Sequence, residues 1–113
     1  MMKTTGLQLP ESIQDDLASI GLHIEVARKR RKIPAKVVYE AAGITPQTYK
    51  RLVSGDPGVA IGTIAKVLHA LNLEHTLMAI ANPAQDEQGI ALEVSRVKRS
   101  DKVYHHGKLD TNF

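Results

Sequence analysis

The 113-residue chain has no cysteine, no tryptophan and a single phenylalanine. Without cysteine it has no disulfide, no thiol catalysis and no cysteine-based zinc site, and we expect a reducing compartment, the cytoplasm. No apolar run approaches the roughly 20 residues that cross a bilayer, and Met1 to Ser12 lacks the apolar centre of a secretion signal. With so few aromatic residues the core must be aliphatic, which favours short packed helices over a sheet.

Signatures of catalysis and of metal binding are also missing. Three histidines are scattered over the expected helices, and His105-His106 lies in the tail with no carboxylate at ligand spacing. The adjacent carboxylates at 15–16 and 86–87 point apart with no apolar pocket around them. There is no glycine-rich phosphate loop and no Ser-His-Asp arrangement. We therefore expect a protein that is not an enzyme and that needs no metal and no cofactor.

The stretch from Ile33 to Leu52 predicts two short helices that meet at a sharp turn. Four apolar residues recur at spacings of three and four on one face of the first helix: Val37, Val38, Ala41 and Ala42. Gly43 can end that helix in the left-handed conformation, and Thr45 offers a hydroxyl cap to a second helix that begins at Pro46. A rigid pair of this kind can cross DNA with its second helix in the major groove.

The second helix of the pair should bury Tyr49, Leu52 and Val53. Four polar residues then face outward or lie at the edge of the buried side: Gln47, Thr48, Lys50 and Arg51. An ordinary helical hairpin with a glycine in its turn fits this spacing equally well. Charge favours DNA, because residues 23–51 hold eight Lys or Arg against two Glu, a net charge of +6, whereas the whole chain carries +3. Such a concentration is typical of a phosphate-binding surface.

Further helices surround the pair. Apolar spacing predicts a long helix before it that ends in the basic run Arg28 to Lys32, and another over residues 61–71 that ends at Asn72. A fifth helix begins at Leu73 and stops at Asn82-Pro83. The predicted fold is all-α, with a compact five-helix DNA-binding domain over residues 12–82 behind a flexible N-terminal arm over residues 1–11.

Past Gly89 the apolar residues alternate with others, which predicts a single β-strand within a linker over residues 83–97. The strand's apolar residues are Ile90, Leu92 and Val94. A lone strand leaves its backbone groups unpaired, so we expect it to pair with a second copy in a homodimer, or weakly with Val103-Tyr104. A two-fold dimer would place two such helix pairs on a pseudo-palindromic operator in double-stranded DNA, roughly 34 Å apart. Residues 98–113 form a polar tail that we expect to be flexible.

The segment from about Leu22 to Leu71 resembles a lambda-repressor-like (Xre/Cro) helix-turn-helix domain. The matching residues are Arg28-Lys29-Arg30-Arg31-Lys32-Ile33, Ala42-Gly43-Ile44-Thr45, Thr48-Tyr49-Lys50-Arg51-Leu52 and Leu68-His69-Ala70-Leu71-Asn72-Leu73. In such domains the positions of Lys36, Gln47, Thr48 and Lys50 commonly approach bases or phosphates. The stretch from Gly55 to Ile64 is also similar to HipB-type antitoxins, which implies a HipA-like kinase toxin as a partner.

Four positions depart from this family pattern. Pro34 and Ala35 stand where Thr or Ser and then Gln are frequent, and alanine cannot make the glutamine's bond to phosphate or base. Val53 replaces a frequent glutamate, and Ala60 replaces a frequent capping serine. The loss of such a cap typically costs about 1 kcal/mol, which a folded domain tolerates.

The predicted function is a sequence-specific transcriptional repressor that regulates its own operon. Its candidate DNA-binding residues are Arg31, Lys36, Thr45, Gln47, Thr48, Lys50 and Arg51. Gln47 is expected to bond an adenine edge and Lys50 a guanine or a phosphate. Two alternatives remain, an antitoxin that chiefly neutralises a kinase toxin and a helical protein-interaction module that does not bind DNA.

Overall fold

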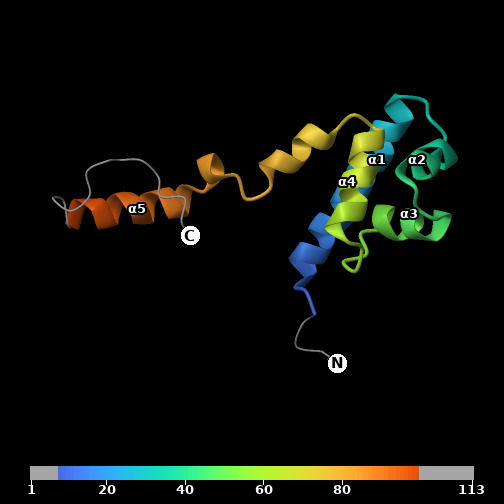
Figure 1. Cartoon of the computed structure of the whole chain (residues 1–113). Coiled ribbons are helices and arrows are strands. Elements are labelled where there is room, and N and C mark those ends of the chain that lie inside the picture. Colours follow the sequence, from blue (N-terminus) through green and yellow to red (C-terminus); the bar gives the residue numbers. More distant parts are fainter. Residues whose placement is uncertain (1–7, 100–113) are drawn as a thin grey trace. The chain divides into compact units, whose positions relative to one another are not determined.

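The structure, a computed structural model, describes residues 8–99, and all regular structure within that range is helical (Figure 1). In chain order the elements are α1 (Glu11–Arg30), α2 (Ala35–Ala42), α3 (Pro46–Val53), α4 (Ile61–Ala70), two short 3₁₀ helices, η2 (Glu74–Ala79) and η3 (Pro83–Gln85), and α5 (Glu87–Arg99). The described residues fall into two compact units, 8–77 and 78–99. The all-α prediction is confirmed.

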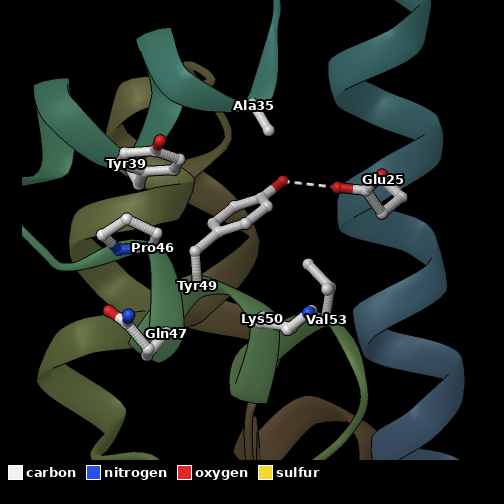
Figure 2. A pocket seen from close by; sticks show the side chains of 8 residues that line it. All are labelled: Glu25, Ala35, Tyr39, Pro46, Gln47, Tyr49, Lys50 and Val53. Carbon is white, nitrogen blue, oxygen red and sulfur yellow. Dashed lines mark hydrogen bonds between the residues drawn. The ribbon is translucent and has the colours of Figure 1, made fainter.

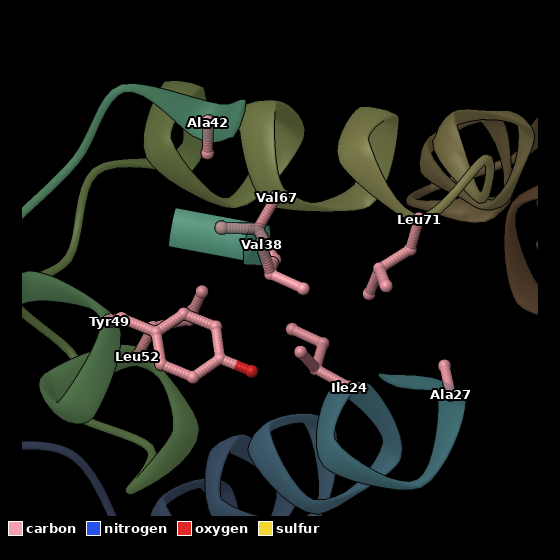
Figure 3. Close-up of a cluster of buried hydrophobic side chains, with 8 residues drawn as sticks. All are labelled: Ile24, Ala27, Val38, Ala42, Tyr49, Leu52, Val67 and Leu71. Atoms are coloured by element: carbon pink, nitrogen blue, oxygen red, sulfur yellow. The ribbon is translucent and has the colours of Figure 1, made fainter. Parts of the chain in front are cut away.

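The core of the first unit is aliphatic apart from one tyrosine, as the composition predicts. Helices α1 to α4 each contribute to it, and the side chains converge between them (Figure 3). The buried residues are Ile24, Ala27, Val38, Ala42, Tyr49, Leu52, Val67 and Leu71. Burying a side chain of the Leu or Val kind contributes about 1.5–3 kcal/mol, so this small cluster is what holds the four helices together.

Helix α1 packs against α3 at a glycine. A Cβ atom added to the buried Gly21 would lie 2.1 Å from the carbonyl oxygen of Val53, which belongs to the backbone of α3. No side chain fits in that space, so the two helices approach as closely here as their backbones allow. The contact fixes where α3 sits on α1.

The end of α4 follows the predicted pattern, but the next segment differs. Ala60 precedes α4 without a side-chain cap, as expected, and Asn72 ends the segment at φ 60°. The fifth helix, expected from Leu73 to residue 81, is instead the 3₁₀ helix η2. Both the backbone N–H and the hydroxyl of Thr76 donate to the carbonyl of Leu73, at 2.9 and 2.7 Å, and this three-residue spacing is that of a 3₁₀ turn.

The predicted strand at Ile90, Leu92 and Val94 is wrong, because these residues lie in helix α5. The same residues fit a helical period, since Ile90 and Val94 are four apart and share a face while Leu92 lies on the opposite side. Strong helix formers surround them, and Asp86 caps the start by accepting the N–H of Gly89 at 3.0 Å. Strand pairing between copies is therefore excluded for this segment.

Other predictions fall partly outside the described residues. Only residues 8–11 of the predicted N-terminal arm are described, and Glu11 is already the first residue of α1. The predicted tail is described only up to residue 99, and its possible pairing segment Val103-Tyr104 lies outside the described residues. Within residues 8–99 no helix is both long and apolar enough to cross a membrane.

Candidate nucleic-acid interface

Helices α2 and α3 meet at the turn that the sequence predicts. Gly43 ends α2 at φ 70°, and the N–H of the next residue, Ile44, donates to the carbonyl of Tyr39 at 3.0 Å, as in a helix that ends in a left-handed residue. The hydroxyl oxygen of Thr45 accepts the N–H of Thr48 at 3.0 Å, and Pro46 takes the first position of α3. The turn is therefore fixed at both ends.

Helix α3 is buried along one side only. Tyr49 and Leu52 keep 5% and 4% of their surface exposed, and Val53 is half-buried beside them. The other side carries three exposed side chains, Gln47, Lys50 and Arg51. Since this polar face is not covered by the described part of the chain, it is free to meet a large partner.

A hydrogen-bonded network that the sequence pattern does not reveal ties α3 to α1. The hydroxyl of Tyr49 donates to one carboxylate oxygen of Glu25 at 2.6 Å (Figure 2). Arg28 donates to both oxygens of the same carboxylate, at 2.7 and 3.1 Å. A further N–H of Arg28 donates to the carbonyl of Ile33 at 2.8 Å. The Glu25 carboxylate thus links α1 to α3, and its partner Arg28 links both to Ile33, which precedes α2.

The network shifts the pKa values of its members. The hydrogen bond from Arg28 is the largest cause that lowers the pKa of Glu25, so this carboxyl stays ionised. Burial raises the pKa of the Tyr49 hydroxyl, and the bond to Glu25 raises it further. Tyr49 therefore keeps its proton and remains a hydrogen-bond donor at neutral pH.

Beside α3 lies an open groove of about 340 Å³ whose lining is mostly apolar. Figure 2 shows its lining side chains, which come from α1, α2 and α3. They are Glu25, Ala35, Tyr39, Pro46, Gln47, Tyr49, Lys50 and Val53. Ala35 is the first residue of α2, so the start of α2 and the polar face of α3 border the same groove.

Residues 24–78 match the family described as helix-turn-helix. The match includes α2, the turn at Gly43, α3 and α4. This segment belongs to the helix-turn-helix family. The family predicted from the sequence is confirmed for this segment, and the match supports the general function of a DNA-binding regulator of transcription. No curated protein and no solved structure matches the chain.

Within the helix-turn-helix domain the predicted contact residues occupy three places. Thr45, Gln47, Thr48, Lys50 and Arg51 belong to α3 and its cap. Lys36 lies beside Ala35 at the start of α2, with 70% of its side chain exposed and its Nζ 4.0 Å from Glu40. Arg31 lies at the end of α1, where its guanidinium donates to the carbonyl of Ala27 at 3.0 Å, and it does not line the groove.

Besides Lys36, which lies near Glu40, two of the basic residues counted from the sequence are paired with carboxylates. Arg28 binds Glu25 and keeps only 15% of its side chain exposed, and the Nε of Arg51 donates to Asp56 at 2.8 Å. The exposed cations that precede α2 are Lys29, Arg30, Arg31 and Lys32. Within the described range no three His, Asp or Glu side chains come together to hold a metal.

Proposed function

We propose that the chain recognises one DNA sequence by placing the polar face of α3 in the major groove, and that it represses transcription from its own operon. One observation carries this proposal: Gln47, Lys50 and Arg51 are exposed on a helix whose other side is locked into the core by Tyr49 and Leu52. A reading helix needs both properties, because exposed side chains read bases only when a rigid support sets their register.

Positive charge near the start of α2 supports the same placement. The exposed run from Lys29 to Lys32 and Lys36 lies close in the chain to Ala35, which borders the groove beside α3. Cations at such an edge bind phosphates and fix the orientation of the domain, whereas α3 supplies the base contacts.

The test is a mobility-shift titration on DNA from upstream of the gene and on a shuffled duplex of equal length, each at 50 and 200 mM salt. We expect tighter binding to the upstream DNA and a loss of about a hundredfold or more on both duplexes at the higher salt. Equal affinity for both duplexes would contradict specific recognition. An affinity that does not change between the two salt concentrations would contradict phosphate binding.

We further propose that two copies bind together through α5. Ile90 and Val94 share one face of this helix and are 45% and 49% exposed. A 13-residue helix is marginal in water by itself, and a matching apolar stripe on a second copy would stabilise it. Light scattering should give a dimer that Val94→Glu converts to monomer. Leu92→Glu, on the opposite side of α5, is the matched control and should leave the dimer intact.

A role as an antitoxin stays a prediction of the sequence resemblance. It is compatible with repression, because a toxin could bind surfaces other than α3. Copurification of a kinase encoded beside the gene would support it, and a repressor isolated alone from cells that express such a neighbour would contradict it.

A further inference from the structure

Helix α3 ends in a turn that is fixed by the backbone of α1. The N–H of Asp56 donates to the carbonyl of Arg51 at 3.0 Å, and the N–H of Gly55 donates to that of Leu52 at 3.0 Å. Gly55 lies at φ 85°, and a Cβ atom there would stand 2.6 Å from the backbone nitrogen of Ala18. Only a glycine fits at position 55, and the turn brings Asp56 back beside the last turn of α3.

Both carboxylate oxygens of Asp56 are engaged in this turn. Oδ1 accepts the N–H of Gly58 at 2.7 Å, and Oδ2 accepts the Nε of Arg51 at 2.8 Å. The hydrogen bond from Arg51 lowers the pKa of Asp56 most, and the bond from Gly58 adds to it. The carboxylate is thus ionised at neutral pH and held by the backbone on one side and by the guanidinium on the other.

Arg51 lies on the polar face of α3, four residues after Gln47 and on the same stripe of the helix. Only its Nε is hydrogen-bonded within the described range, and 49% of its side chain is exposed. The two terminal nitrogens, Nη1 and Nη2, remain available. That pair of donors matches the O6 and N7 acceptors of guanine in the major groove.

We propose that Asp56 is a positioning residue that holds Arg51 in place to read a guanine. This inference rests on the proposed function and adds a specificity determinant outside α3. An arginine fixed before binding loses less side-chain entropy when it meets the base, and its donors point in one direction. If Asp56 merely neutralised Arg51, its removal would instead strengthen binding to every sequence, because a negative charge would leave the DNA-binding surface.

The experiment compares base preference in four versions of the full chain: wild type, Arg51→Ala, Asp56→Asn and the double variant. A preferred site is first selected from randomised duplexes with the wild type. Affinities are then measured on that site and on every single-base change of it. Asp16→Asn is the matched control, since Asp16 is an exposed carboxylate of α1 that makes no hydrogen bond or ion pair among the described residues and its loss changes the net charge equally.

We expect Arg51→Ala and Asp56→Asn to lose about tenfold of the preference for the same guanine, with the double variant losing no more than Arg51→Ala alone. Asp16→Asn should keep the full preference. Arg51→Lys keeps the charge without the paired donors and should lose the preference as Arg51→Ala does, which tests the reading of guanine by Arg51 separately from its charge.

Three outcomes overturn the inference. A preserved guanine preference in Asp56→Asn would do so, and so would an equal loss of preference at every base, which would mark Asp56 as merely structural. A wild type with no base preference at all would overturn the proposed function and this inference together, whereas the first two outcomes leave the proposed function standing.

Discussion

The hydroxyl of Tyr49 donates a 2.6 Å hydrogen bond to the carboxylate of Glu25 and joins α3 to α1 across 24 positions of the chain. Because Glu25 also accepts two bonds from Arg28, the bond anchors α3 to a group that is itself fixed. The contacts on the buried side of α3 thus set the direction in which its polar face points. Substitutions that remove this hydrogen bond should lower the free energy of unfolding, although neither residue belongs to the polar face of α3.

Tyr49→Phe removes the anchor and keeps the ring in the core. We expect a loss of about 1–2 kcal/mol in the free energy of unfolding, because a buried hydrogen bond to a charged group disappears while Glu25 retains Arg28. Thermal denaturation should show a melting temperature lower by roughly 4–8 °C per kcal/mol. Tyr39→Phe is the control, since its hydroxyl makes no hydrogen bond in the described residues and its ring lies 6.1 Å from that of Tyr49. Equal melting temperatures for the two variants would show that the anchor contributes nothing.

Acid should weaken the domain through Glu25. The hydrogen bond from Arg28 lowers the pKa of this carboxyl below its usual value of 4.5, so the unfolded chain takes up a proton at higher pH than the folded domain does. The contribution of Glu25 is therefore complete above about pH 4.5 and is lost as the pH falls through the lower folded pKa. Melting curves from pH 7 to 3 should show Glu25→Gln less stable than wild type at pH 7, with the difference shrinking toward pH 3. A difference that does not change with pH would contradict this assignment.

Short-range sequence signals predicted the turn between α2 and α3. Gly43, Thr45 and Pro46 act through their own backbone geometry and their nearest neighbours, so their roles can be derived without knowing what packs around them. The same holds for the missing cap at Ala60. The buried side of α3 followed from helical spacing alone.

Long-range partners and short ambiguous segments were not predictable in this way. Arg28 counts as a free cation in the sequence, and only the folded chain brings Tyr49 to the carboxylate that it binds. Arg51 is paired with Asp56 through a turn whose course depends on Gly55 and α1. In α5 the residues Ile90 to Val94 fit both periods, and helix propensity together with the cap at Asp86 decides between them.

Gly21→Ala should separate α1 from α3. The new Cβ atom would stand 2.1 Å from the carbonyl oxygen of Val53, and backbone cannot move aside as a side chain can. We expect a loss of about 1–3 kcal/mol despite the higher helix propensity of alanine. Gly62→Ala is the matched control in α4, where a Cβ atom meets nothing within 4 Å, and it should gain up to about 1 kcal/mol. Urea denaturation measures both, and a stabilised Gly21→Ala variant would refute the close packing.

Gln47→Ala and Lys36→Ala should weaken DNA binding in different ways. Gln47 lies on the polar face of α3, so its loss should relax the preference for one base pair by about 1–3 kcal/mol and leave binding to other sequences nearly unchanged. Lys36 is an exposed cation at the start of α2, and its loss should lower affinity for all duplexes and reduce the slope of log affinity against log salt by about 1. Lys66→Ala, which removes the same charge from α4, controls for net charge. The two effects are separated by titrating each variant, at three salt concentrations, on the duplex selected with the wild type and on its single-base changes. If Gln47→Ala instead reduced affinity uniformly, the helix would touch the phosphate backbone there and the reading role would pass to Lys50 or Arg51.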